Sequence, residues 1–311
     1  MKKWLLTPML ALLLAGCQDE SAKEPVENAE VQQEESTSFP LTVTDALGNE
    51  VTLEEDPGRI VSLVPSNTEI LFAVGAGDEV VGVGDADNYP EEVKSIDKIG
   101  GLELNVEKII SLTPDLVIAH EMVAGTFEGA LEQLRNAGIT VYTVNDAISI
   151  RDVQDTIIDI GKLTAEEENA KEVVSNMNVK IENLRVKTAS VETKKSVYVE
   201  IDSSPFSVGS GTLMDNMLKE INATNVLGDQ EGWIQVDPES IVSLNPEVIL
   251  STYGEESVAQ IKDRNGWNTV TAVETNQVAA IDGDIATRPG PRLVDALELF
   301  AKAIYPDAFQ E

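Results

Sequence analysis

The sequence NVEKIISLTPDLVI at residues 105–118 returns later in the chain as DPESIVSLNPEVIL at residues 237–250. In each copy a residue that favours the N-cap position, Asn105 or Asp237, opens a short helix. A proline ends each helix, and an apolar strand follows it. The repeat therefore predicts that the two parts of the chain contain one related helix–strand unit.

Around the first copy, strand and helix patterns alternate. Helices are predicted from Pro65 to the glycines at 75–77, with Ser66 and Glu69 spaced as a capping box, and over residues 126–136. Apolar runs predict a hairpin at residues 39–54 and buried strands at 59–64, 80–83, 116–119 and 140–144. Such alternation predicts a parallel sheet with helices on both faces.

A long amphipathic helix is predicted within residues 149–195. Apolar residues recur there at steps of three or four through residues 170–184. About 25 residues, at roughly 1.5 Å each, would extend as far as a whole domain, so we interpret this helix as a connector rather than a core element. The alternation then resumes, with strands at 196–201, 248–251 and 278–281 and helices at 212–220, 257–264 and 291–303.

The N-terminus is typical of a bacterial lipoprotein. Lys2 and Lys3 precede an apolar run, residues 5–15, which is too short to span a bilayer but suits a signal peptide. The run ends in Leu-Ala-Gly-Cys, which resembles a lipobox, and Cys17 is the only cysteine of the chain. Residues 1–17 are thus expected to be a lipoprotein signal, the alternative being an ordinary secretory signal with a chance cysteine.

An acidic segment, residues 18–38, follows Cys17. It holds seven acidic residues and almost no large apolar side chain, which predicts a disordered tether. A lipidated Cys17 would anchor the globular body to the cell membrane on its extracytoplasmic face.

Composition excludes several functions. The chain has 55 Asp and Glu against 22 Lys and Arg, a formal net charge of −33, which disfavours binding to nucleic acid. One cysteine and one histidine cannot form a disulfide framework, a zinc finger or a Cys–His nucleophile pair. Walker A, G-x-G-x-x-G and G-x-S-x-G motifs are absent from the sequence, so we expect no enzyme.

From about residue 40 to 307 the chain resembles the solute-binding proteins of ABC importers, in the class that carries cobalamin, ferric siderophores and haem. The matching phrases are RIVSLVPSNTEI (59–70), VVGV (80–83), NYP (88–90), LTPDLVIA (112–119) and RPGPRL (288–293). The last phrase, with Gly266-Trp267, most resembles the cobalamin-binding branch.

The resemblance implies an α/β fold of the class III periplasmic-binding-protein type. Its two Rossmann-like lobes, residues 39–148 and 196–311, would be joined by a single long helix within residues 149–195. The ligand, cobalamin or another metal chelate, would lie in the cleft between the lobes. No cofactor of the protein's own is expected, and the partners implied are a permease with its ATPase subunits. We expect a monomer.

The resemblance also suggests which residues contact the ligand. They are Tyr89, Leu102 and His120 in the N-terminal lobe, and Phe206, Trp233, Arg288 and Arg292 in the C-terminal lobe. His120 either gives an axial nitrogen to a ligand metal or forms a polar part of the cleft wall. Trp233 is expected in a loop before a helix, as a ligand platform or as core. Arg288 and Arg292 either meet the ligand or pair with acidic residues.

Glu107 and Glu239 occupy equivalent positions in the two copies of the repeat. In the family that the chain resembles, one glutamate per lobe pairs with arginines of the permease. The alternative is that both glutamates only favour the first turn of a helix through the helix dipole.

Taken together, these observations make a lipid-anchored cobalamin receptor of an importer the leading function. A ferric-siderophore or haem receptor on the same fold is the runner-up, and a surface hydrolase is the third reading.

Overall fold

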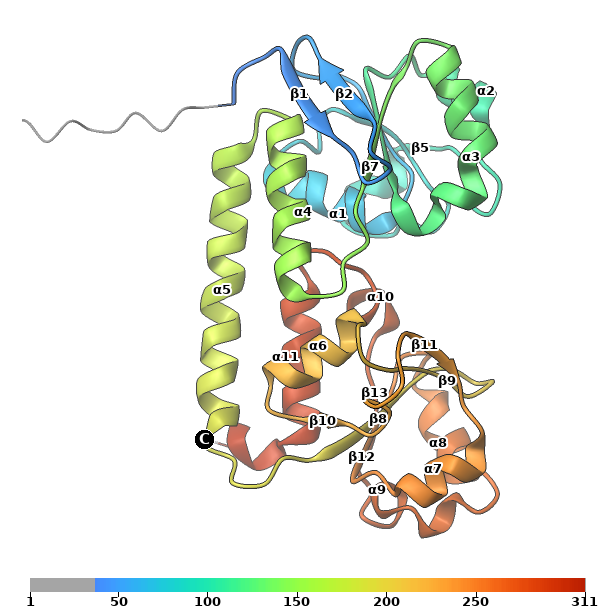
Figure 1. Ribbon diagram of the computed structural model, residues 1–311, viewed down its shortest axis with the longest axis vertical. Helices are drawn as coiled ribbons and strands as arrows, with labels where there is room; N and C mark the ends of the chain where they lie inside the picture. The colour runs from blue at the N-terminus through green and yellow to red at the C-terminus, as the bar shows by residue number, and fades with distance from the viewer. Residues whose placement is uncertain (1–36, 311) are drawn as a thin grey trace, which may run out of the picture. The chain divides into compact units, whose positions relative to one another are not determined.

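The structure is a computed structural model that describes residues 37–310 (Figure 1). These residues belong to one unit by their internal contacts. The expected signal peptide, the lipidation site Cys17 and nearly all of the expected tether lie outside the described residues. The domain boundaries at residues 39, 149 and 196 stay a prediction.

The N-terminal half, residues 37–148, is built on a five-stranded parallel sheet. The strand order is β5 (Asp97–Lys98), β4 (Val80–Val83), β3 (Ile60–Ser62), β6 (Leu116–His120) and β7 (Thr140–Val144). The predicted hairpin is also present, as β1 (Leu41–Thr44) paired with β2 (Glu50–Leu53).

Both faces of this sheet are covered, as predicted. Every residue of β6 is buried, and successive residues point to opposite faces. Leu116 and Ile118 join a hydrophobic cluster with α1 (Pro65–Val74). Val117 and Ala119 join a second cluster with α2 (Val106–Ser111) and α3 (Glu121–Asn136). A short 3₁₀ turn, η1 (Glu91–Ser95), connects β4 to β5.

The expected capping box at the start of α1 is wrong. The helix begins at Pro65, with Val64 at the N-cap position and no side chain capping it. A proline suits the first helical position because its missing N–H would have no partner there. Glu69 is buried and binds two arginines of the C-terminal half instead of the backbone. The predicted end is right, because Gly75 takes the left-handed conformation (φ 103°) directly after Val74.

The C-terminal half, residues 196–310, contains a mixed sheet. The three predicted strands are parallel neighbours: β8 (Ser196–Asp202), β12 (Val248–Ser251) and β13 (Val278–Ala280). A two-residue strand, β10 (Thr224–Asn225), also pairs with β8. Two short strands that the sequence analysis missed extend the sheet in antiparallel fashion, β9 (Phe206–Val208) and β11 (Trp233–Gln235).

Helices cover this sheet as well. Its helical segments are α6 (Leu213–Glu220), α7 (Pro238–Leu244), α8 (Glu256–Lys262), η2 (Trp267–Thr269), α9 (Thr271–Glu274), α10 (Gly283–Ala286), α11 (Leu293–Ile304) and η3 (Pro306–Phe309). Tyr198 and Ile249 pack in one cluster with Trp267, while Val199 and Leu250 face the cluster that contains α6 and α11.

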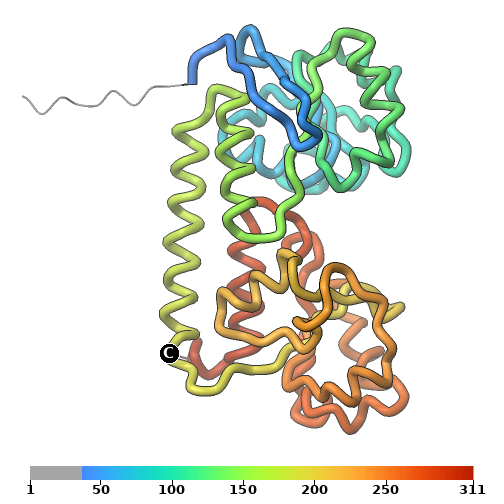
Figure 2. Tube along the Cα trace, viewed as in Figure 1, coloured from blue at the N-terminus to red at the C-terminus, as the bar shows by residue number. Residues whose placement is uncertain are grey.

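Two antiparallel helices, α4 (Ile150–Leu163) and α5 (Glu167–Ala189), lie beside the N-terminal half, and the longer α5 continues alongside the C-terminal half (Figure 2). The long helix of the prediction is α5, but its interpretation as a mere connector is wrong. Its residues Ala170, Met177, Ile181 and Leu184 are buried in one hydrophobic cluster that also contains side chains of α1, α4, α6 and α11. Each fully buried Met, Ile or Leu side chain contributes roughly 1.5–3 kcal/mol of hydrophobic stabilisation, so α5 is part of the core.

The two copies of the repeat have the same local structure. Asn105 caps α2 and Asp237 caps α7, and β6 and β12 follow these helices. Before the strand, Thr113 (φ 46°) and Asn245 (φ 48°) both adopt the left-handed conformation, each directly ahead of the proline. This conformation is rare for a β-branched residue such as threonine, so its recurrence at the matching position confirms a shared backbone design.

Candidate ligand-binding cleft

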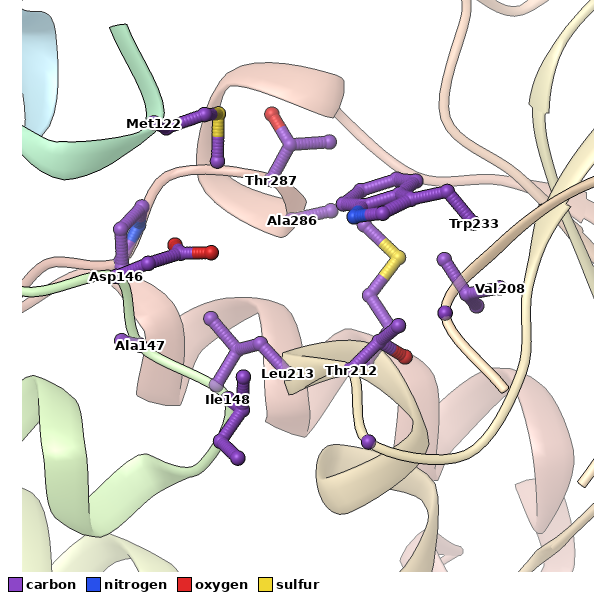
Figure 3. A pocket seen from close by; sticks show the side chains of 14 residues that line it. Met122, Asp146, Ala147, Ile148, Val208, Thr212, Leu213, Trp233, Ala286 and Thr287 are labelled. Carbon is purple, nitrogen blue, oxygen red and sulfur yellow. The ribbon is translucent and has the colours of Figure 1, made fainter. Parts of the chain in front are cut away.

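A cavity lies between the two halves, with about 740 Å³ of empty space that includes part of its open mouth (Figure 3). The N-terminal half supplies Met122, at the start of α3, and Asp146, Ala147 and Ile148, from the segment between β7 and α4. The C-terminal half supplies Val208, Gly211, Thr212, Leu213, Met214, Gly232, Trp233, Ala286, Thr287 and Pro289.

The topology explains why these segments meet there. Met122 and Asp146 are each the second residue after a strand, β6 and β7 respectively, and these strands are parallel neighbours. In open parallel sheets the connections at the carboxyl ends of the strands form the binding crevice. Because the sequence predicted both strands, this rule could have found Met122 and Asp146, which the residue-by-residue resemblance missed.

The cavity wall is mostly apolar. Side chains of methionine, leucine, isoleucine, valine and alanine make up most of it, and the polar exceptions are Asp146, Thr212 and Thr287. Met122 and Ile148 are large apolar residues that are nevertheless exposed. Ligand sites commonly combine an apolar wall with a few polar groups that orient the ligand.

An aromatic platform stands at one side of the cavity. Trp233 is 51% exposed, and its ring lies 6.2 Å from that of Phe206, centroid to centroid, with only 10° between the planes. Antiparallel pairing of β11 with β9 holds the two residues on neighbouring strands. The expectation of a loop at Trp233 is therefore wrong, and so is the alternative that it belongs to the core.

Arg288 and Arg292 both pair with the buried carboxylate of Glu69. Arg288 Nη1 donates to Glu69 Oε1 at 3.0 Å, and Arg292 donates from Nε (2.8 Å) and Nη2 (2.6 Å) to the two oxygens of Glu69. The hydrogen bonds to Glu69 raise the pKa of Arg292. The structure contains the pairing with an acidic residue that the sequence analysis named as one alternative, and contact of either arginine with the ligand stays a prediction.

Further contacts extend this ion cluster to Asn88, Asp284 and Tyr89. Arg288 also donates to Asn88 at 2.7 Å and to Asp284 at 2.9 Å, and Asn88 donates to Asp284 at 2.6 Å. The guanidinium carbon of Arg292 lies 4.0 Å from the ring centroid of Tyr89, which is an attractive cation–π contact. Together Glu69, Asn88, Asp284, Arg288 and Arg292 form what we call the interhalf clamp.

Trp233 is the one predicted contact residue among those that line the cavity, and the residues not among them are Tyr89, Leu102, His120, Phe206, Arg288 and Arg292. Leu102 is 96% exposed and does not line the cavity. His120 is buried at the end of β6, where its Nδ1 accepts a hydrogen bond from the backbone N–H of Met122 at 3.2 Å. His120 therefore caps α3 and holds Met122 at the cavity. An axial bond from the other ring nitrogen of His120 to a ligand metal stays a prediction.

The cap at His120 makes stability depend on pH. Burial lowers the pKa of His120, although the nearby carboxylates of Asp146 and Glu121 act in the opposite direction. The unfolded chain, with a pKa of about 6.5, then takes up the proton first as the pH falls, so stability is lost below that value. We expect the free energy of unfolding to fall more steeply from roughly pH 7.5 to 5 in the wild type than in His120→Asn, since asparagine can cap without titrating. Equal pH profiles in urea denaturation would contradict this assignment.

Glu107 and Glu239 are both exposed and both lie in the first turn of a helix, α2 and α7 respectively. One helix belongs to each half (Figure 1). Neither side chain lines the cavity. Their role in docking stays a prediction, and their exposure is what a docking role requires.

An apolar cleft between two α/β halves, with an exposed aromatic platform, is the arrangement of a solute-binding protein. The chain belongs to the periplasmic binding protein family, whose model matches residues 60–285. The members are solute-binding components of transport systems rather than enzymes. Both the fold class and the family that the sequence suggested are confirmed. No helix within residues 37–310 has the length and apolarity needed to cross a membrane.

Three relatives illustrate the range of the family. The chain is 42% identical over 313 residues to YvrC of Bacillus subtilis (strain 168), an uncharacterized ABC transporter substrate-binding lipoprotein, covering 99% of this chain and 98% of YvrC. The vitamin B12-binding protein BtuF of Vibrio cholerae shares 27% identity at a TM-score of 0.70, covering 82% and 99%. The haem-binding protein RhuT from Roseiflexus sp. RS-1 shares 29% identity at a TM-score of 0.72, covering 80% and 98%.

Proposed function

We propose that this protein is the extracytoplasmic receptor of an ABC importer and that it binds cobalamin or another corrinoid in the cleft. The observation that carries the proposal is the half-exposed indole of Trp233, stacked on Phe206 at the edge of an apolar cavity. A corrin is a broad, nearly flat ring whose methyl and methylene groups would lie against these surfaces. Its peripheral amides would find hydrogen-bond partners in Asp146, Thr212 and Thr287.

Similarity to BtuF supports a corrinoid ligand, because that protein binds vitamin B12. The alternative is haem or a ferric siderophore on the same scaffold, and similarity to the haem-binding protein RhuT favours it. The charges of the residues that line the cavity distinguish a corrinoid ligand from haem. Haem carries two propionates, whereas the lining residues of this cavity include one carboxylate and neither lysine nor arginine.

Anchoring and delivery complete the proposal. The lipobox ending at Cys17 and the lipoprotein name of YvrC support a lipid anchor at the outer face of the cell membrane. We propose that Glu107 and Glu239 dock the receptor on the permease, which works with its ATPase subunits. Support comes from their equivalent positions in the repeat, their exposure, and their distribution over the two halves.

Titration of the purified protein with cyanocobalamin, haemin and a panel of ferric siderophores tests the ligand. We expect saturable, one-to-one binding of cyanocobalamin in isothermal calorimetry. Binding of haemin or a siderophore without cyanocobalamin would replace the corrinoid by the runner-up.

The platform is tested by Trp233→Ala, which should weaken cyanocobalamin binding by about 30-fold or more, since buried aromatic anchors are worth about 2 kcal/mol or more. Trp233→Phe is the matched control, because a phenyl ring still stacks on Phe206 and should retain most of the affinity. A Trp233→Ala protein that binds like the wild type would remove this residue from the site.

A further inference from the structure

We infer that Asp146 acts as a charge filter, so that the cleft favours ligands whose rim is neutral or cationic and rejects those that carry carboxylates there. This inference rests on the proposed function, because it concerns the ligand class of the same cleft. It assigns a specificity role to a residue that the family resemblance had not singled out.

The position of Asp146 carries the inference. Its side chain projects from the segment between β7 and α4 into the cavity, toward the side on which Trp233 stands (Figure 3). A ligand lying on the Trp233 platform would therefore present its rim to this carboxylate. The backbone N–H of Asp146 donates to Glu121 Oε2 at 3.0 Å, which fixes the segment and leaves the carboxylate of Asp146 to face the cavity.

The surroundings add negative charge rather than neutralise it. A second hollow shares Asp146 and Ile148 with the cleft, and its wall includes the acidic residues Glu121, Asp152, Asp155 and Asp159. The residues lining these two hollows include neither lysine nor arginine. Arg151 and Lys162 do pair with Asp155 and Asp159, at 3.8 and 3.4 Å, but these pairs leave Asp146 uncompensated.

Two positive features near the cleft are already matched by carboxylates. Arg288, next to the lining residues Thr287 and Pro289, is hydrogen-bonded to Glu69 and Asp284. The N-terminus of α6 carries partial positive charge, but Asp215, which also pairs with Lys219, lies buried in its first turn. An incoming carboxylate would therefore meet Asp146 without a free cation on the described cavity wall to offset it.

The experiment pairs a change in ligand charge with a change in protein charge. Cyanocobalamin is compared with a derivative in which one peripheral amide has been hydrolysed to a carboxylate, on wild type and on Asp146→Asn. In the wild type we expect the carboxylate form to bind at least about fivefold more weakly than the amide form. In Asp146→Asn that ratio should shrink toward one, and about 0.5 M salt should shrink it in the wild type as well. Glu192→Gln, which removes the same charge from an exposed site between α5 and β8, should keep the wild-type ratio.

Each outcome has one meaning. The same ratio in wild type and Asp146→Asn would overturn the filter while leaving corrinoid binding in place. Failure of the wild type to bind cyanocobalamin would instead overturn the proposed ligand. The filter is then judged on haemin, whose two propionates should make its affinity rise in Asp146→Asn, and an unchanged affinity for haemin overturns it.

Discussion

Replacing Glu69 by glutamine should lower the free energy of unfolding by about 3 kcal/mol, a large share of the stability of a protein of this kind. The side chain of Glu69 is only 2% exposed, and it accepts three hydrogen bonds from Arg288 and Arg292, which are 13% and 20% exposed. Glutamine keeps the shape but leaves Arg292 facing a neutral amide and Arg288 with Asp284 as its remaining carboxylate partner. Removing one partner of a buried ion cluster costs more than the cluster contributes, because the remaining charge loses its compensation.

Urea denaturation of Glu69→Gln measures this loss. Glu182→Gln is the matched control, since Glu182 is 66% exposed and its pair with Arg185 is a surface contact of 3.5 Å, so we expect a change below about 0.5 kcal/mol. Because the clamp joins the two halves, hydrogen exchange in Glu69→Gln should also speed up at Asn88 and Asp284. A Glu69→Gln protein within about 0.5 kcal/mol of the wild type would show that the clamp contributes little.

The clamp is also the feature that the sequence could least reveal. Arg288 and Arg292 stand far from Glu69 along the chain, and no local pattern relates them. Ser66 and Glu69 do have the residue types and the spacing of a capping box. Its prediction failed because a proline starts the helix without a side-chain cap, and because two arginines from the other half take up the carboxylate.

Helices and strands with a clear pattern of apolar residues were predictable from the sequence. The buried strand at β6 and the stop of α1 at Gly75 follow from apolar runs and from glycine's access to the left-handed conformation. The short strands β9 and β11 have three residues each, too few for a periodic pattern to emerge, and so the sequence analysis missed both strands and expected a loop at Trp233. The amphipathic period of α5 gave its helix correctly but could not tell which helices its apolar face would meet.

The residues of the candidate site were predictable only in part. The family resemblance suggested Trp233 and Phe206, and their rings stack in the structure, while Tyr89 meets Arg292. Leu102 was carried over from the family by position alone, and it projects into solvent. Asp146 and Ile148 carry no motif of their own. They line the cleft because the chain leaves β7 at the sheet edge where the halves meet.

Reversing the charge at both Glu107 and Glu239 should abolish uptake of the ligand into cells while leaving its binding to the purified receptor unchanged. The two residues lie outside the cavity wall and are exposed at the starts of α2 and α7, so neither substitution touches the ligand site. At a docked surface, an arginine in place of each glutamate would oppose the permease arginines that the family resemblance implies. Like charges brought together at an interface cost several kcal/mol, and two such contacts would reduce complex formation below detection.

The measurement pairs cellular uptake of radiolabelled ligand with calorimetric binding for Glu107→Arg/Glu239→Arg. A matched control, Glu54→Arg/Glu192→Arg, makes the same change in net charge at exposed glutamates outside the repeat and should support normal uptake. Each single substitution should reduce uptake less than the double substitution does. The unchanged glutamate can still pair with its side of a two-fold permease. Both glutamates also lie at the start of a helix, where the helix dipole alone favours a glutamate. Normal uptake by the double variant would therefore reduce Glu107 and Glu239 to helix-stabilising residues, and the docking surface would have to be sought elsewhere on the two halves.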